Sequence, residues 1–363
     1  MSLGTVSKNG HVSASQIKTA HLCMRKWWFD KVAHVRDRDR YHFAVGHALH
    51  ATAERYLLKE SSSWEGLFPP QWDNQILEED AKMVKEMAKR AVAQGVWQAA
   101  PGIVVEYPVA LLVGRRMLDH RGLPKVARAI TFKDDRRGRQ HTAFTTLYDG
   151  SPLPEGWDDM SPFVGFIDNL FMWDNPYPKV TDHKTAKNKT YTLNSVQLSA
   201  DLQMNCYAAL PLALYPEFDF VALRHNVFLK NHEDPQVFTT DAVVTAGAVA
   251  RMWATVVETA EELHWMKKQN QKIEGVSPEH RADNFKNIPG ALEQGRPEAC
   301  EAFGKCPFRD ACFGRRCVSD LVRDMDAPEV KKTPIIRPKR VTYSLNLSPQ
   351  PRGSTLRLNH PVI

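Results

Sequence analysis

The sequence predicts an α/β fold in which helices flank a mixed β-sheet. Residues 163–170, and the segment that leads into residues 182–184, are rich in the apolar, β-branched and aromatic side chains that strands favour. The turn-rich residues 173–178 separate these two strands. Helical patterns precede and follow them, at residues 44–60 and 194–214. This order of helices and strands favours a sheet covered by helices.

The other expected elements follow in the same way. Residues 115–140 are basic, and we interpret them as a solvated loop, with a DNA-facing loop as the alternative. Trp27 and Trp28 are assigned to the core in preference to stacking on bases. The remaining expectations are a helix at 15–31, an amphipathic helix at 75–94, a strand at 103–109, a strand at 219–230 and a long helix at 240–270.

Two acidic residues and a lysine stand on the two central strands. Side chains two apart on a strand share a face, so Asp182 and Lys184 point the same way. The neighbouring strand can bring Asp168 beside them. Two carboxylates can hold Mg²⁺ or Mn²⁺ through oxygen, and an adjacent ammonium can position or activate a water. These residues predict hydrolysis of a phosphodiester, against the alternative of an ordinary charged pair on a strand.

A histidine on the first of these helices is a further candidate. Gly46 and His50 lie one turn apart on one helix face. A histidine on a buried face is more often a core residue, but a neutral imidazole can also complete a divalent metal site. His50 is therefore a candidate metal ligand.

Three more polar residues stand at suitable points in the chain. Gln203 and Tyr207 are four apart on the helix at 194–214, where an amide and a phenol together can grip a phosphate or a water. An ordinary helix surface is the alternative. Glu106 lies in the strand at 103–109 and is either an extra acid near the metals or an outward-facing strand residue.

In this order the residues resemble the RecB-like branch of the PD-(D/E)xK nuclease superfamily. The pattern of that branch is Gly-x-x-x-His on a helix, then Gly-x-(Ile/Val)-Asp, Asp-x-Lys-Thr and Gln-x-x-x-Tyr. The corresponding segments here are Gly46 to His50, Gly165 to Asp168, Asp182 to Thr185 and Gln203 to Tyr207. The resemblance covers residues 11–320 of this sequence.

The resemblance implies a restriction-endonuclease-like mixed sheet with a helical lobe, and a metal-dependent DNA exonuclease of recombination, repair or end processing. Its substrate would be DNA that is single-stranded or has free ends. The implied roles are metal binding for His50, Asp168, Asp182 and Glu106, assistance of the attacking water for Lys184, and contact with DNA or the active site for Gln203 and Tyr207.

Two other functions stay open, a structure-specific endonuclease and a catalytically idle DNA-end-binding subunit of a helicase–nuclease complex. The intact Asp168, Asp182 and Lys184 argue against the idle subunit, which has no chemical need for all three. The sequence contains no Gly-x-x-x-x-Gly-Lys-(Ser/Thr) phosphate loop, so helicase activity would come from a partner.

Four of the six cysteines cluster in residues 300–317. Residues 1–20 are polar and contain no secretory signal, so we expect a cytoplasmic protein of a bacterium, an archaeon or a virus-infected host cell. In such a compartment clustered cysteines favour metal or cluster binding over disulfides. Cys206 lies inside the Gln-x-x-x-Tyr motif and is expected to be a small buried residue.

The iron–sulfur nucleases of the RecB-like branch place one cysteine before the nuclease core and three after it, and this chain is similar. The resemblance implies a structural [4Fe–4S] cluster that clasps the two ends of the fold, held by Cys23, Cys300, Cys306 and Cys312. The usual Cys-x-x-Cys would require a cysteine at Phe303, and the nearest is Cys300. Cys317 is therefore an alternative fourth ligand. A zinc site and free thiols are further alternatives.

Composition separates a nearly neutral fold from a basic tail. The chain has 363 residues, 43% of them hydrophobic, and no apolar run as long as a membrane span. Residues 331–363 contain seven Lys or Arg, five Pro and no Asp or Glu, so the net charge of +6 leaves −1 for residues 1–330. We expect this tail to be disordered and to bind DNA phosphates or a protein, with a solubilising role as the alternative.

The expected organisation has four parts. They are an N-terminal segment with the first cluster cysteine at 1–43, the nuclease core with helical insertions at 44–290, the cysteine segment at 291–325 and the basic tail at 326–363.

Overall fold

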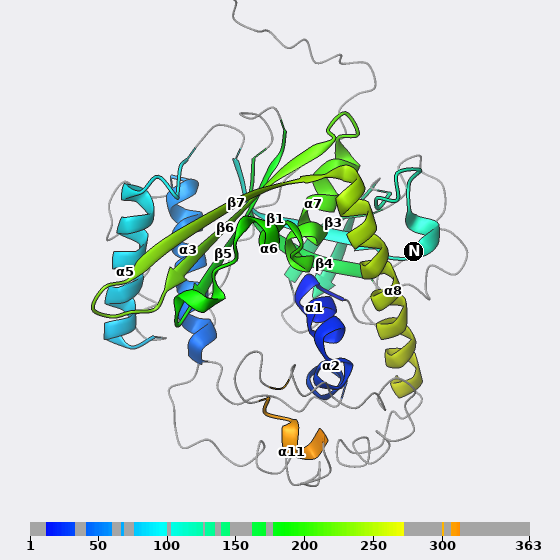
Figure 1. The fold of residues 1–363 in the computed structure, drawn as a ribbon, viewed down its shortest axis with the longest axis horizontal. Coiled ribbons are helices and arrows are strands. Elements are labelled where there is room, and N and C mark those ends of the chain that lie inside the picture. Colours follow the sequence, from blue (N-terminus) through cyan, green and yellow to red (C-terminus); the bar gives the residue numbers. More distant parts are fainter. Residues whose placement is uncertain are drawn as a thin grey trace, which may run out of the picture.

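The computed structural model describes residues 12–32, 41–59, 67–68, 76–99, 103–125, 128–134, 139–145, 162–171, 177–271, 300 and 306–312. These residues form a mixed sheet with helices around it, which confirms the predicted α/β class (Figure 1). The five strands lie in the order β1-β4-β5-β6-β7. Their bounds are β1 Ile103–Leu112, β4 Pro162–Phe171, β5 Lys179–Ala186, β6 Phe220–Leu229 and β7 Gln236–Thr245.

The strand that carries the Asp-x-Lys residues, β5, is the central one. It pairs with β4 in an antiparallel and with β6 in a parallel direction, while β1 with β4 and β6 with β7 are antiparallel. A parallel pair needs a crossover connection. Here the crossover contains α6 (Ser195–Ser199) and α7 (Leu202–Leu214). The crossover therefore delivers the Gln-x-x-x-Tyr helix to the sheet directly after the Asp-x-Lys strand.

Two hydrophobic cores pack against the sheet. Val221 and Leu223 of β6 belong to one and Phe228 to the other, as the alternation of side chains along a strand requires. The first core includes α1 (Ala14–Leu22), α2 (Met24–Lys31), α7 and α8 (Ala246–Gln271). The second includes α3 (Tyr41–Leu57) and α5 (Glu78–Ala93), which lie side by side away from the first group (Figure 1).

The helix expected at 15–31 is interrupted. Cys23 has an extended backbone and lies between α1 and α2, ending one and beginning the other. Its N–H donates to the Thr19 carbonyl and its carbonyl accepts from the Trp27 N–H, so one backbone group is satisfied at each of these helix ends. Trp27 and Trp28 are fully buried, which confirms the prediction that they pack in the core. Cys206 is fully buried too, as predicted.

Two further boundaries differ from the prediction. The long helix expected at 240–270 begins at Ala246, because residues 236–245 form β7 instead. This segment is rich in Val and Thr, which suit a strand, and it pairs with β6 along its whole length. The helix expected at 194–214 is divided at Ala200, and Asp201 then caps α7 through the Met204 N–H. The break occurs because the Asp201 side chain starts a new helix as its N-cap, which requires an extended backbone at that residue.

The basic segment 115–140 is not a plain loop. Residues Arg115–Met117 form a short 3-10 helix, η3. Strands β2 (Arg128–Asp134) and β3 (Arg139–Thr145) pair as a separate two-stranded sheet. The β-branched and aromatic residues 130–132 outweigh the flanking charges.

No helix within the described ranges is both long and apolar enough to cross a membrane. Cys317, the tail at 326–363 and most of the cysteine segment 291–325 lie outside the described residues.

Candidate active site

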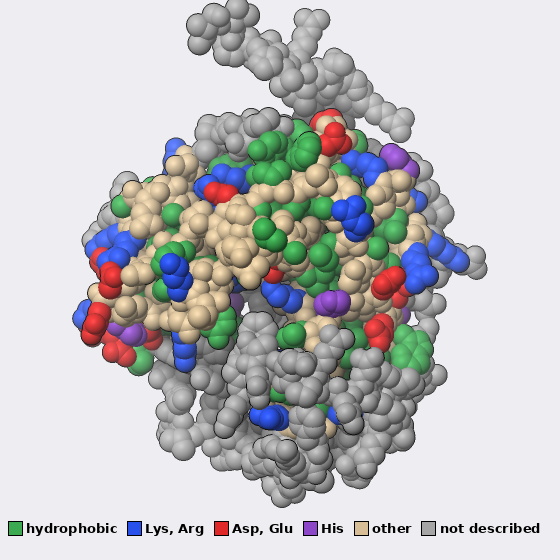
Figure 2. All heavy atoms as spheres, viewed as in Figure 1, with side chains coloured by type: hydrophobic (Ala, Val, Ile, Leu, Met, Phe, Trp, Pro, Cys, Tyr) green, Lys and Arg blue, Asp and Glu red, His purple; other side chains and the backbone are tan. Residues whose placement is uncertain are grey.

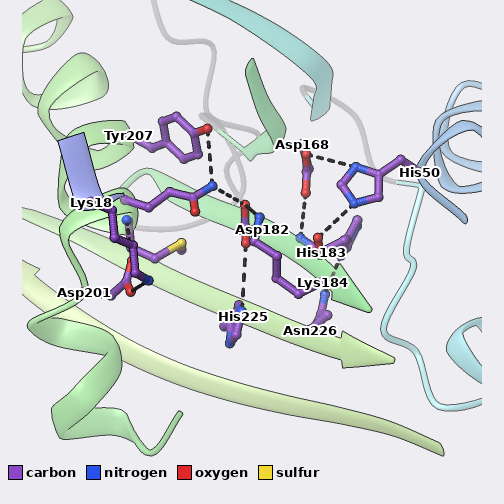
Figure 3. A network of polar contacts seen from close by, with 12 residues as sticks. Lys18, His50, Asp168, Asp182, His183, Lys184, Asp201, Tyr207, His225 and Asn226 are labelled. Carbon is purple, nitrogen blue, oxygen red and sulfur yellow. Dashed lines mark hydrogen bonds and ion pairs between the residues drawn. The ribbon is translucent and has the colours of Figure 1, made fainter. Parts of the chain in front are cut away.

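The candidate site forms where two central strands separate. β4 and β5 pair at three positions, the last of them Asn169 with Thr181. Asp168 and Asp182 are the next residues along these two strands. Just beyond, the His183 backbone N–H donates to Asp168 Oδ2 at 2.6 Å (Figure 3). The Asp168 carboxylate therefore accepts a hydrogen bond from a backbone N–H that is not paired between β4 and β5, and this bond orients Asp168.

His50 reaches the site from α3. Its Nε2 donates to the His183 carbonyl oxygen at 2.8 Å, and its Nδ1 lies 3.3 Å from Asp168 Oδ1. Because a carbonyl oxygen can only accept, Nε2 carries the proton and Nδ1 faces the carboxylate. A Cβ at Gly46 would lie 3.4 Å from Thr185 Oγ1, an ordinary contact distance, so α3 lies close to β5 at this point.

Asp182 is at the centre of a second polar group. The Lys184 ammonium donates to Asp182 Oδ1 at 2.8 Å, and the Gln203 amide donates to the same oxygen at 3.1 Å. The Gln203 amide also lies 3.4 Å from the Tyr207 hydroxyl. Figure 3 shows Lys184 and Tyr207 on either side of Asp182. The structure therefore places together residues that the sequence predicted on four separate elements, α3, β4, β5 and α7.

Two local features hold α7 against the sheet. Asp201 at its N-terminus accepts from the Met204 N–H at 3.0 Å and binds Lys18 of α1 at 2.6 Å. Gly165 of β4 leaves room for Tyr207, since a Cβ at this position would lie only 3.1 Å from Tyr207 Cε1. A larger residue at position 165 would displace the phenol.

The two carboxylates have opposite pKa shifts. Burial raises the pKa of Asp168, but His50, His183 and Lys184 together lower it by more, so the net shift is downward. Burial raises the pKa of Asp182 too, and the charge of Asp168 adds to the rise. The Lys184 ammonium offsets only part of it, so the net shift of the Asp182 pKa is upward. Without a metal, ionisation of Asp182 beside the charged Asp168 is therefore unfavourable.

Lys184 and Tyr207 keep their protons. Burial lowers the pKa of Lys184, but Asp182 and Asp168 raise it by more. The Lys184 side chain is 41% exposed, so its charge lies at the boundary between the site and solvent. Burial raises the pKa of Tyr207 well above its usual value, and the same two carboxylates raise it further. The site offers one cation and one neutral hydroxyl.

His225 is a site residue that the sequence analysis missed. It stands on β6 in register with Asp182, and its Nε2 lies 3.9 Å from Asp182 Oδ2. The residue is 7% exposed, and its Nδ1 has no hydrogen-bond partner among the described residues. Burial lowers the pKa of His225. A histidine in the middle of a buried apolar strand was the signal in the sequence that could have found it.

The residues present were compared with the needs of a divalent cation. Across the described residues, no set of three or more His, Cys, Asp or Glu side chains forms a ready-made metal site. The backbone of Glu106 lies in β1, but its side chain is outside the described part. The donor chemistry nonetheless fits a hard cation, because Asp168 and Asp182 are buried oxygen donors whose repulsion a positive charge would relieve.

The four predicted cluster cysteines come from both ends of the described chain and lie near one another. The Cys306 N–H donates to the Cys300 carbonyl at 3.1 Å. Burial raises the pKa of the Cys300 thiol, and Cys23 and Cys312 raise it further. Arg25 of α2 donates to Cys312 Sγ at 3.2 Å, which joins α2 to α11 (Arg309–Cys312). The rings of Phe29 and Phe308 stack 5.1 Å apart at the same junction.

The fold and the site together define a mixed α/β sheet that carries acidic residues and a lysine on its central strands. A model of the PD-(D/E)XK nuclease superfamily matches residues 11–313, and the chain belongs to this superfamily. A solved structure titled "Crystal structure of SSO0001" aligns with 68% of this chain and 85% of that chain at 9% identity, with a TM-score of 0.21. None of the curated proteins compared with the chain matches it.

Proposed function

We propose that this nuclease is a divalent-metal-dependent DNA exonuclease of the RecB-like branch, acting on free ends in recombination, repair or end processing. One observation carries the metal-dependent chemistry: two buried carboxylates, Asp168 and Asp182, stand where β4 and β5 separate, beside the cation Lys184. The order of the four motifs supports the exonuclease assignment.

Asp168, Asp182 and His50 would hold Mg²⁺ or Mn²⁺, with Glu106 as a further acidic ligand. His50 suits this role because its Nε2–H is engaged by the His183 carbonyl, which leaves Nδ1 directed at the Asp168 carboxylate. Metal-binding histidines commonly donate their second N–H to such a carbonyl. A bound cation would supply neutralisation of phosphate charge and a more acidic water.

The chain's own side chains prepare the site for this chemistry. Lys184 remains charged, so it acts by orienting the attacking water and stabilising negative charge that develops on the phosphate. Gln203 holds Asp182 Oδ1, and Tyr207 supports Gln203. Because Gln203 and Tyr207 both come from α7, a shift of this helix would change their positions relative to Asp182 together.

The test uses linear DNA labelled at one end, in single- and double-stranded forms, and closed circular DNA with Mn²⁺. We expect the linear DNA to be degraded from an end and the circular DNA to survive. Asp182→Asn should lower the rate at least about a thousandfold, since metal and water activation contribute several kcal/mol. Cutting of circles would favour the endonuclease. Binding of ends without cleavage would favour the idle subunit.

We also propose that Cys23, Cys300, Cys306 and Cys312 bind a structural [4Fe–4S] cluster. The nearness of four thiols from both chain ends supports this, as does Arg25, whose guanidinium at Cys312 Sγ would stabilise thiolate charge. Protein purified without oxygen should be brown and contain about four irons per chain. Cys23→Ser should remove the colour and destabilise the fold. Colourless protein with one zinc per chain would contradict the cluster and support a zinc site.

A further inference from the structure

A row of buried polar side chains crosses the sheet behind the candidate site. The ring of His183 on β5 lies 3.0 Å from Asn169 Nδ2 of β4 and 3.2 Å from Asn226 Nδ2 of β6. Asn226 Oδ1 accepts from Thr239 Oγ1 of β7 at 2.9 Å. Four neighbouring strands therefore each contribute one side chain. Asn169, His183 and Asn226 are all at most 4% exposed.

The surroundings of this row are apolar and aromatic. The centroid of the His183 ring lies 6.2 Å from that of Trp97 and 5.9 Å from that of Phe228, both in the core formed with α3 and α5. Polar groups in such a layer cost free energy unless they are hydrogen-bonded. Apolar residues would fill the same space at no such cost, so the row needs a reason beyond packing.

The ring of His183 is clamped from both sides. Burial lowers its pKa to about 3, so the imidazole is neutral. Because Asn226 Oδ1 accepts from Thr239, Asn226 Nδ2 donates to the ring at Nδ1. The ring proton is then on Nε2. Exchanging the oxygen and nitrogen of the Asn169 amide lets Nε2 donate to the Asn169 oxygen, which otherwise has no partner among the described residues. These bonds fix the rotation of the ring and, through Cβ, the backbone of His183.

That backbone holds two residues of the candidate site. The His183 N–H donates to Asp168 Oδ2 at 2.6 Å, and the His183 carbonyl accepts from His50 Nε2 at 2.8 Å. The first bond directs the carboxylate of Asp168. The second selects the tautomer of His50 and turns Nδ1 toward Asp168. A residue that the Asp-x-Lys motif leaves unspecified thus touches both proposed ligands, through its main chain alone.

We propose that His183 is a positioning residue for the metal site. Its ring, clamped by Asn169 and Asn226 on one face of the sheet, holds the peptide groups that orient Asp168 and His50 where the strands separate. The inference rests on the proposed function, because it concerns the same metal site. An ordinary core histidine would stabilise the sheet without affecting the ligands.

The experiment compares His183→Phe with Thr239→Val. The first keeps an aromatic ring but removes both clamping bonds, while the second removes a bond at the far end of the same row. Mn²⁺ binding is measured by calorimetry on the full chain, together with kcat and the DNA KM. We expect His183→Phe to weaken Mn²⁺ binding about tenfold, as the loss of a supporting contact does at other metal sites. Thr239→Val should leave Mn²⁺ binding unchanged.

Two further variants sharpen the outcome. His183→Gln again offers a donor and an acceptor, so it should recover part of the Mn²⁺ affinity. If His183→Phe does not fold, Asn169→Leu, which removes one clamp, should still weaken Mn²⁺ binding. The inference would be overturned if His183→Phe or Asn169→Leu bound Mn²⁺ as tightly as wild type. It would also be overturned if Thr239→Val weakened Mn²⁺ binding as much as His183→Phe does. Neither result would contradict the nuclease proposal. A wild-type protein that neither binds Mn²⁺ nor cuts DNA would overturn the proposed function itself.

Discussion

Replacing Asp182 by Asn should stabilise the metal-free protein and destabilise the metal-loaded one relative to wild type. Asn keeps the shape of the side chain and an oxygen for Lys184 and Gln203. It removes only a negative charge, on a side chain that is 4% exposed. That charge is unfavourable because burial and Asp168 together raise the pKa of Asp182.

Burial is the largest cause of the upward shift of the Asp182 pKa, and the charge of Asp168 adds to it. The Lys184 ammonium, 2.8 Å from Asp182, offsets much of this but is itself 41% exposed and screened. We therefore expect Asp182→Asn to gain about 1 kcal/mol without metal. With Mn²⁺ at about 100 times its Kd, wild type alone gains about 2.7 kcal/mol, which reverses the order.

The pH dependence has a definite sign. The folded-state pKa of Asp182 is raised above its ordinary value of 3.8, so ionisation of Asp182 costs stability. The cost is fully present above the folded pKa and disappears below the unfolded pKa. The advantage of Asp182→Asn in chelator should therefore be complete near neutral pH and vanish as the solution is acidified toward pH 3.8.

Urea unfolding in EDTA and in Mn²⁺ measures both effects. Asp241→Asn is the matched control, because Asp241 is an exposed carboxylate paired with Arg224 on the edge of the sheet. It should not gain stability in EDTA and should keep the full Mn²⁺ response. If Asp182→Asn is less stable than wild type in EDTA, or if Mn²⁺ stabilises both proteins equally, the reasoning about the carboxylate pair is wrong.

Three other outcomes are expected. Gly165→Val should displace Tyr207 and lower kcat about tenfold or more with little change in DNA binding, whereas unchanged kcat would mean that the phenol is dispensable. Mn²⁺ affinity measured by calorimetry should fall as the solution is acidified toward the raised pKa of Asp182, because protons compete with the cation for this carboxylate. Truncation after Val330 should flatten the salt dependence of DNA binding, because the tail holds seven cations and no acids. On the displayed face of the fold, by contrast, cations and acids are interspersed (Figure 2). An unchanged salt dependence would exclude a role of the tail in binding DNA phosphates.

Local patterns in the sequence were enough to predict the α/β class and the separate elements that bear the candidate residues. Alternation along a strand put Asp182 and Lys184 on one face, and helical spacing did the same for Gln203 and Tyr207. These are relations within one element, set by backbone geometry. Boundaries were less certain: residues 240–245 were expected to be helical but form the end of β7, since pairing with β6 outweighs local preference.

Only the tertiary structure decided how the elements meet. It put β5 at the centre of the sheet, made β4 part from it at Asp168 and Asp182, and turned His50 toward the gap. It also revealed His225 and His183, whose neighbours lie more than ten residues away in sequence. The pKa of a carboxylate depends on such distant charges and on burial, which no spacing along the chain encodes. The sequence determined which side chains were available, and the fold determined which of them share a site.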